Sequence, residues 1–150
     1  MLDIYVDADG CPVKGEVYRV ARRYGLHVIL VANARMRLPD EDNLELVVVG
    51  EAFDAADDWI VEHVGENDIV ITGDIPLAHR CLQVGAQVLD PRGREYDANS
   101  IGSALAMRDL LAELREQGTM SGGPAPFQKR DRSRFLQRLD EIVQRISRSS

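Results

Sequence analysis

Three aspartates follow predicted strands directly and are the residues of this sequence best suited to chemistry. Asp7 and Asp9 lie in an Asp-Ala-Asp-Gly turn after a strand over 2–6, and Asp74 follows a strand over 68–72. Ligands of open parallel α/β sheets bind beyond the carboxyl ends of the strands. Crowded carboxylates repel one another unless a cation compensates them, and Mg²⁺ or Mn²⁺ prefers such oxygen ligands. The sequence therefore predicts an acidic divalent-metal site at this edge of the sheet.

Helix capping is a second interpretation of the same residues. An aspartate between a strand and a helix is a common N-cap, so Asp7, Asp9 and Asp74 would each begin the following helix. Spacing alone leaves both interpretations open. Asp57 and Asp58 lie on a predicted helix. One of them is expected to face inward, although alone they are typical solvated carboxylates.

The hydrophobic pattern predicts a regular alternation of strands and helices. Strands are expected over 2–6, 27–32, 44–49, 68–72 and 86–89, and helices over 13–24, 54–64, 75–84, 101–117 and 131–146. Short connections between them favour a three-layer α/β fold with a central, mostly parallel sheet of about five strands. Two C-terminal helices are expected to pack on the same sheet. Residues 1–150 form a single domain in this interpretation, with a mobile loop over 117–130 that contains Gly122-Gly123-Pro124.

Composition limits the possible partners and compartment. The net charge of −7 disfavours attraction to nucleic acid over the whole surface, but residues 1–100 carry −10 (9 Lys/Arg, 19 Asp/Glu) and residues 101–150 carry +3 (9 and 6). A local anion-binding face on the C-terminal part is therefore expected. No apolar run approaches the roughly 18 residues of a membrane span, and no signal peptide is recognisable. Two cysteines without a paired spacing favour reduced thiols and a cytoplasmic protein.

Several enzyme classes fit the sequence poorly. The Asp7/Asp9 turn also suits haloacid-dehalogenase phosphatases, but these need a downstream lysine and a further acid after a Gly-Asp pair. No lysine occurs between Lys14 and Lys129, and Gly73-Asp74 is followed by Ile-Pro-Leu-Ala. Glycine-rich phosphate loops and a nucleophile elbow are missing, and the histidines have no ligand-like spacing.

The motifs taken together identify a family. They are Val6-Asp7-Ala8-Asp9-Gly10-Cys11-Pro12-Val13-Lys14, Val31-Ala32-Asn33, Ala56-Asp57-Asp58-Trp59-Ile60-Val61, Asp68-Ile69-Val70-Ile71-Thr72-Gly73-Asp74-Ile75-Pro76-Leu77-Ala78, Pro91-Arg92-Gly93, Met107-Arg108-Asp109, Gly122-Gly123-Pro124 and Arg130-Asp131-Arg132. From Ile4 to about Phe135, the chain resembles the YaiI/YqxD family of uncharacterised bacterial proteins. That family is similar in fold to the PIN-like nuclease superfamily.

The resemblance implies a set of acidic residues and a fold. PIN-like nucleases carry an acid after the first strand, one on a central helix and one after the fourth strand. These positions correspond to Asp7, Asp57 and Asp74 as catalytic residues and metal ligands, with Asp9 as a supporting ligand. Many PIN nucleases have one more acid shortly after the third acidic residue, whereas Ile75-Pro76-Leu77 has none. This smaller set of acids argues against binding of two metal ions.

Two functions of different classes follow from these observations. The first is a Mg²⁺- or Mn²⁺-dependent phosphodiesterase, a hydrolase acting on RNA, whose backbone would be steered by basic side chains. The basic residues expected to do so are Lys14, Arg35, Arg37, Arg92, Arg108, Lys129, Arg130 and Arg132. The second is a non-catalytic module that keeps the acidic pocket and binds a metal, a nucleotide or a protein.

Overall fold

The computed structural model describes residues 2–52, 54–118 and 125–149. The strands are β1 (Asp3–Asp7), β2 (His27–Ala32), β3 (Leu44–Val48), β4 (Ile69–Ile71), β5 (Gln87–Leu89) and β6 (Glu95–Tyr96). The helices are α1 (Lys14–Tyr24), α2 (Ala55–His63), α3 (Ile75–Gln83), α4 (Ile101–Glu116) and α5 (Lys129–Ser149). The predicted order of elements is confirmed, and β2 has the predicted bounds.

The strands form one sheet in the order β3-β2-β1-β4-β5-β6, and every pairing is parallel except that of β5 with β6. This confirms a mostly parallel α/β sheet, with β6 added to the expected strands. The chain builds outward from β1 through β2 to β3 and then crosses to the other side of β1 to add β4. The order of addition reverses between β1 and β4, and such a switch point is where open α/β sheets bind ligands.

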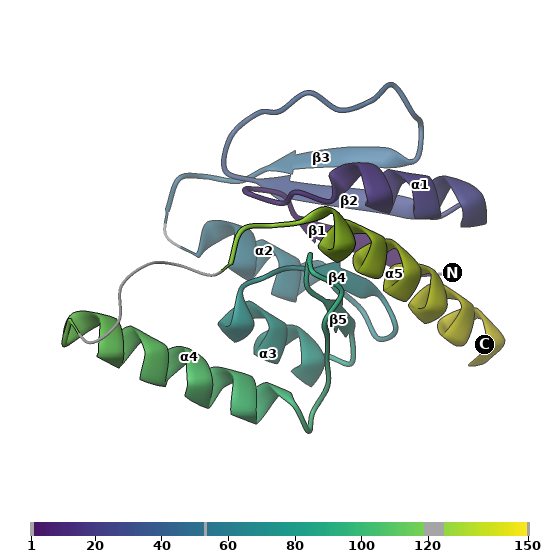
Figure 1. The fold of residues 1–150 in the computed structure, drawn as a ribbon. Coiled ribbons are helices and arrows are strands. Elements are labelled where there is room, and N and C mark those ends of the chain that lie inside the picture. Colours follow the sequence, from purple (N-terminus) through teal and green to yellow (C-terminus); the bar gives the residue numbers. More distant parts are fainter. Residues whose placement is uncertain (1, 53, 119–124, 150) are drawn as a thin grey trace.

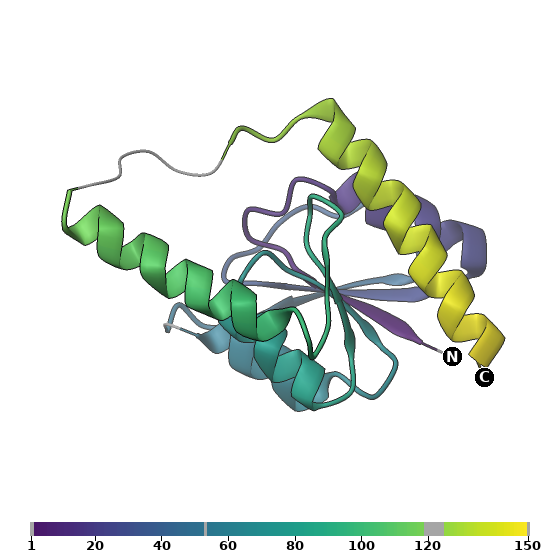
Figure 2. The same ribbon diagram turned by 60° about the horizontal axis from the view of Figure 1, so that its bottom comes forward.

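Helices cover both faces of the sheet (Figure 1). On one face α1 and α5 pack together, and their apolar side chains join those of β1 and β2 in one core cluster. On the other face α2 and α3 cover the sheet, and α4 packs against α3. The predicted C-terminal helices therefore lie on opposite sides of the sheet, and α4 projects beyond α3 in Figure 2. The core strands are buried on both faces, which explains their continuous apolar sequences.

The predicted loop over 117–130 is only partly within the described residues. Helix α4 ends at Glu116, residues 125–128 have no regular structure, and α5 begins at Lys129. Residues 119–124 lie outside the described part of the chain. None of the described helices is both long enough and apolar enough to cross a membrane.

Candidate functional site

Acidic side chains surround one cavity at the switch point between β1 and β4. The cavity has a volume of about 330 Å³, and the acids that line it are Asp7, Asp9, Glu51, Asp54, Asp57 and Asp74. They come from the end of β1 and the turn after it, from the segments that follow β3 and β4, and from the first turn of α2. Among the described residues that line this cavity none is lysine or arginine. All of the predicted acidic site residues therefore lie around one hollow.

Thr72 joins the ends of β1 and β4 at the floor of the site. Its hydroxyl donates a 2.9 Å hydrogen bond to Oδ2 of Asp7 and accepts one of 3.0 Å from the backbone N–H of Asp74. Thr72 is 2% exposed, so these contacts are shielded from water. The register of β1 with β4 brings Val6 opposite Ile71, which places Asp7 and Thr72 beyond the paired residues. Strand pairing and one hydroxyl thus fix two of the acids.

Asp9 is held by the end of β2. Its Oδ2 accepts a 2.8 Å hydrogen bond from the backbone N–H of Asn33, whose side-chain amide in turn donates to the carbonyl of Gly50 at 3.0 Å. The chain turns immediately after Asp9 because Gly10 adopts a positive φ of 74°, which glycine tolerates without strain. Asp7 and Asp9, which both precede this turn, line the same two hollows.

The capping interpretation is right for one aspartate and wrong for two. Helix α1 begins after Val13 with no side-chain cap, so Asp7 and Asp9 do not cap it. Asp74 does cap α3, because its Oδ1 accepts a 3.0 Å hydrogen bond from the N–H of Leu77. Asp74 therefore combines a helix cap with a place in the acidic cavity.

The structure distinguishes the adjacent acids of α2. Asp57 is half-buried and lines the cavity, whereas Asp58 is exposed and pairs with Arg80 at 2.9 Å outside it. Neighbouring helix positions differ by about 100° around the axis, so only one of them faces the site. The inward residue is Asp57.

Burial and mutual repulsion raise the pKa values of two site carboxyls. For Asp57, loss of hydration is the larger cause, followed by the charges of Asp74 and Asp7, and together they raise its pKa to about 6. Loss of hydration also raises the pKa of Asp7, which the hydrogen bond from Thr72 partly opposes. Arg80 opposes the shift of Asp57 only in part, as Thr72 does for Asp7, so a bound cation would favour the charged form of both carboxyls.

The donor set suits a hard divalent cation. One oxygen of each of Asp7, Asp9 and Asp74 accepts the hydrogen bond described above, and no described residue donates to the other oxygen or to Asp57. Mg²⁺ in proteins takes one or two carboxylates and keeps several waters, so an open set of free oxygens fits it. Within the described residues no group of three or more His, Cys, Asp or Glu side chains is close enough to enclose a metal ion. Any ion here would therefore be incompletely enclosed by the protein.

Sequence reasoning did not single out four of the residues that build the site. Glu51 and Asp54 line the cavity, Asn33 holds Asp9, and Thr72 holds Asp7. All four follow strands at the carboxyl edge of the sheet, which is the signal that could have identified them. Asp54 has a φ of 68°, a left-handed conformation that aspartate tolerates better than most residues.

Some of the predicted basic residues are engaged in the fold. The side chains of Arg92 and Arg132 lie on the Phe127 ring at 5.7 and 5.2 Å from its centroid. Arg92 also pairs with the buried Asp131 at 3.2 Å and donates to the carbonyl of Ala125, and Arg132 donates to the carbonyl of Pro12 at 2.7 Å. These contacts hold the start of α5 beside the Asp9 turn, the Asp-Ala-Asp-Gly segment over 7–10.

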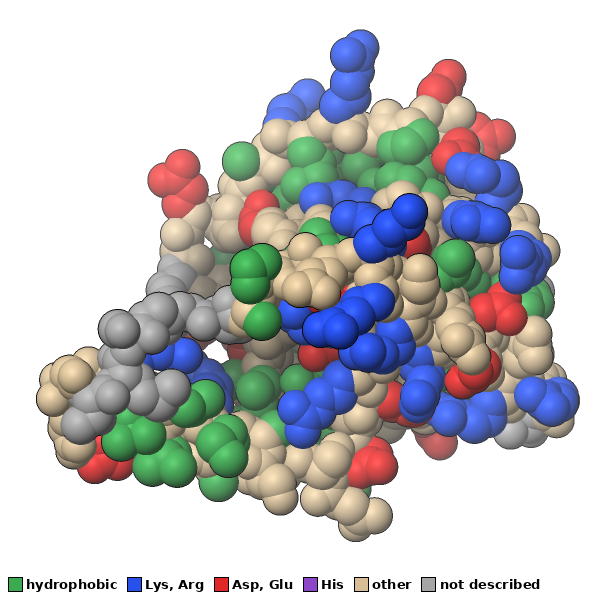
Figure 3. All heavy atoms as spheres, viewed as in Figure 1, with side chains coloured by type: hydrophobic (Ala, Val, Ile, Leu, Met, Phe, Trp, Pro, Cys, Tyr) green, Lys and Arg blue, Asp and Glu red, His purple; other side chains and the backbone are tan. Residues whose placement is uncertain are grey.

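The other predicted basic residues are distributed around the molecule. Lys14 is half-buried and donates to the carbonyl of Cys11 at 3.0 Å, whereas Lys129 and Arg130 are exposed at the start of α5. Arg35 and Arg37 are exposed in the loop between β2 and β3, and Arg108 lies on α4. Figure 3 shows Lys and Arg side chains gathered over α5, as the charge of the C-terminal part leads one to expect.

Comparison with known sequences places these features in a family context. A family model described as "Uncharacterized BCR, YaiI/YqxD family" matches residues 5–145. The UPF0178 protein of Rhodospirillum centenum is 55% identical over 152 residues, covering 99% of both chains. Relatives of the same designation from Nitrobacter winogradskyi (53% identical, 97% of this chain and 93% of the relative) and Paramagnetospirillum magneticum (55%, 99% and 98%) are similar throughout. No solved structure matches the chain.

Proposed function

The chain belongs to the YaiI/YqxD family, and we propose that it is a divalent-metal-dependent phosphodiesterase that cleaves RNA at the acidic cavity. The convergence of six carboxylates from separate elements on one hollow at the switch point of the sheet carries this proposal. Burying part of this negative charge together costs free energy, and a structural role alone would not require it. The resemblance to PIN-like nucleases supports the same reaction class.

Some of the carboxylates would bind the metal ion, and one would accept a proton from the attacking water. The free oxygens of Asp7 and Asp74 would hold Mg²⁺ or Mn²⁺ together with water, with Asp9 nearby as a supporting acid. The ion would supply charge neutralisation at the scissile phosphate. Thr72 and Asn33 keep two of these carboxylates oriented toward the hollow. Asp57 faces the same space from α2 and accepts a proton from water near neutral pH, given its pKa of about 6.

Basic residues beside the cavity suit the approach of a polyanion. The Asp9 turn, Pro91 and Asp74 line an adjoining hollow of about 220 Å³. Arg132 donates to the carbonyl of Pro12, which follows Cys11 of this hollow, and the exposed Lys129 and Arg130 begin the same helix. Positive charge here would offset repulsion between RNA phosphates and the acidic cavity.

The two cysteines favour a cytoplasmic setting for such a reaction. Cys11 and Cys81 are buried and form no disulfide bond.

The experiment compares cleavage of labelled single-stranded and structured RNA with Mn²⁺ and with EDTA. Replacement of Asp7, Asp57 or Asp74 by asparagine keeps the hydrogen-bond acceptor but removes the charge. We expect each of the three variants to lose at least about 100-fold in rate. Asp58→Asn on the same helix is the matched control and should cleave as the wild type does.

The outcomes separate the enzyme from the alternative. Cleavage that survives Asp7→Asn or Asp74→Asn would arise from another site or a contaminant and would overturn the proposal. A rise in the unfolding temperature on adding Mn²⁺ without cleavage would favour the binding module that keeps the acidic pocket.

A further inference from the structure

We propose that a groove between α4 and the start of α3 binds an unpaired stretch of the RNA that leads into the acidic cavity. The groove has a volume of about 690 Å³, about twice that of the acidic cavity. Its apolar and basic lining residues include Ile75, Arg94, Met107, Arg108, Leu111 and Arg115. The binding surface itself follows from these side chains, whereas its role in cleavage rests on the proposed function.

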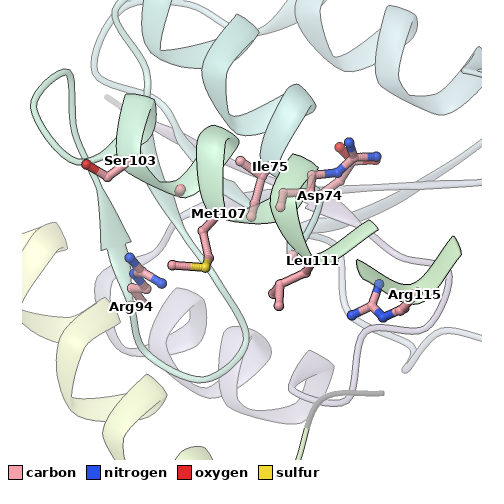
Figure 4. A pocket seen from close by; sticks show the side chains of 10 residues that line it. Asp74, Ile75, Arg94, Ser103, Met107, Leu111 and Arg115 are labelled. Atoms are coloured by element: carbon pink, nitrogen blue, oxygen red, sulfur yellow. The ribbon is translucent and has the colours of Figure 1, made fainter. Parts of the chain in front are cut away.

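One stripe of α4 supplies an apolar wall of the groove. Met107, Leu111 and Arg115 are four residues apart and so lie above one another on one helix face. Figure 4 shows Met107 and Leu111 between Arg94 and Arg115, with Ile75 of α3 facing them. Met107 is 54% exposed, although a large apolar side chain is usually covered in a helix that packs on its neighbour. The groove therefore offers apolar surface between charged ends.

The three arginines of the groove outnumber its one lining acid, Asp74, although Asp90 lies within electrostatic reach of Arg94. Arg94 and Arg115 form no ion pair with any described residue, and the Arg94 guanidinium lies 5.2 Å from the Tyr96 ring centroid. Among the described residues Arg108 forms an ion pair with Asp109 alone, at 3.5 Å, and both side chains are more than half exposed. Such an exposed pair contributes little stability, so all three guanidinium groups are available to phosphate oxygens. Charge complementarity thus selects an anionic occupant.

The combination of arginines and apolar side chains favours an unpaired strand over a duplex. Unpaired nucleotides present both phosphates and exposed base faces, and proteins bind the first with cations and stack the second on aromatic rings or arginine planes. In this groove the arginine planes, flanked by the apolar wall, would take the base faces. A duplex hides its base faces by stacking and leaves Met107 and Leu111 without a partner. A free phosphate or a single sugar phosphate would use the arginines but not the apolar wall.

The groove adjoins the acidic cavity, because Asp74 lines both. Asp74 lines the groove, the acidic cavity and the hollow beside the Asp9 turn, and Gly73 lines two of these three. An RNA strand lying along α4 therefore brings a phosphate to Asp74, where the acids converge. The arginines act as positioning residues, because they hold the strand without touching the reacting phosphate.

Binding of a labelled ten-nucleotide single-stranded RNA, measured by fluorescence anisotropy in EDTA, tests this surface without cleavage. Arg94→Gln and Arg115→Gln should each raise the dissociation constant by about fivefold, and the double variant by about 25-fold. The slope of log affinity against log salt should fall by about 1.4 in the double variant, because two phosphate contacts are lost. Met107→Glu should also weaken binding, whereas Arg19→Gln on the exposed face of α1 should leave it unchanged.

Each outcome decides one proposal separately. If the groove variants bind like the wild type while cleavage persists, the groove assignment is wrong and the phosphodiesterase stands. If they lose binding but the wild type never cleaves, the groove stands and the phosphodiesterase falls. Equal affinity of the wild type for a blunt RNA duplex would overturn the preference for unpaired RNA. The altered side chains are at the surface, so an unchanged unfolding temperature should accompany each variant and exclude misfolding.

Discussion

The Thr72 hydroxyl donates a 2.9 Å hydrogen bond to the Asp7 carboxylate across 65 positions of sequence. The same hydroxyl accepts the backbone N–H of Asp74. A single buried oxygen therefore sets the separation between the acid that ends β1 and the acid that follows β4. This contact links the switch point of the sheet directly to the geometry of the candidate site.

Thr72→Val should destabilise the protein by about 1–2 kcal/mol. Valine has nearly the same shape but leaves the N–H of Asp74 without its partner and removes the donor to Asp7. Thr72→Ser retains the hydroxyl and should lose only the contacts of one methyl group. Chemical denaturation of both variants measures the difference, and equal stability of the valine and serine variants would show that the hydroxyl contributes nothing.

Asp57→Asn should stabilise the protein at pH 8 but not at pH 4, in metal-free buffer. The pKa of Asp57 is about 6 in the folded protein, against 3.8 for an ordinary aspartate. The folded state therefore binds more protons than the unfolded state between these values, and stability falls as pH rises through about 6. Asparagine removes this loss, which we place at about 1 kcal/mol after allowance for solvent screening of a half-buried group.

Asp58→Asn is the matched control for this pH dependence. It removes an exposed ion pair with Arg80, so its effect should stay below about 0.5 kcal/mol at either pH. Urea unfolding of wild type and both variants at pH 4, 6 and 8 gives the comparison. A gain for Asp57→Asn of the same size at every pH would mean that its charge is not the cause.

Asp74→Ala and Asp74→Asn should separate the two roles of this residue. Alanine removes the cap on the N–H of Leu77 and should cost about 1 kcal/mol, whereas asparagine caps a helix about as well as aspartate. Both substitutions remove the negative charge from the cavity. We therefore expect a difference in the free energy of unfolding and an equal loss of Mn²⁺-dependent thermal stabilisation, both measurable by differential scanning calorimetry.

Gly93→Ala should destabilise the fold by about 2 kcal/mol or more. Gly93 has a φ of 88°, and a Cβ there would lie 2.8 Å from Cγ of Arg134 and 3.0 Å from the backbone nitrogen of Phe135 on α5. Gly102 in the first turn of α4 has open space around it, so Gly102→Ala should stabilise the protein by up to about 1 kcal/mol. Opposite shifts in unfolding temperature are the expected readout.

The fold was largely predictable because its strands and helices have clear apolar patterns. β2 is a continuous apolar run between polar segments, and its bounds were predicted to the residue. β6 is only two residues long and its sequence, Glu95-Tyr96, has no period to detect. The position of β4 beside β1 also could not be predicted from local sequence, since it depends on which strand edge the crossover reaches.

The candidate site was predictable in its strand-end acids but not in their supports. Asp7, Asp9 and Asp74 follow strands that end at the same edge, so their proximity follows from a parallel sheet. Whether Asp57 or Asp58 faces the site depends on how α2 is oriented about its own axis, and two adjacent acids in the sequence do not reveal that orientation. Glu51 lies in a connection without periodicity, and only the three-dimensional course of that connection brings it to the cavity.

Asp74 has a consequence for how occupancy of the site could be communicated to the rest of the molecule. Its Oδ1 accepts the hydrogen bond of the Leu77 amide at the first turn of α3, and the same carboxylate lines the cavity that a cation would enter. A ligand that changes the charge on this carboxylate changes the strength of its hydrogen bond to the helix start, and by linkage the helix start affects ligand binding by the same free energy. The exchange of the Leu77 amide hydrogen with solvent should therefore change when the cavity is occupied. A change at the start of α3 would also reach α4, which packs on it.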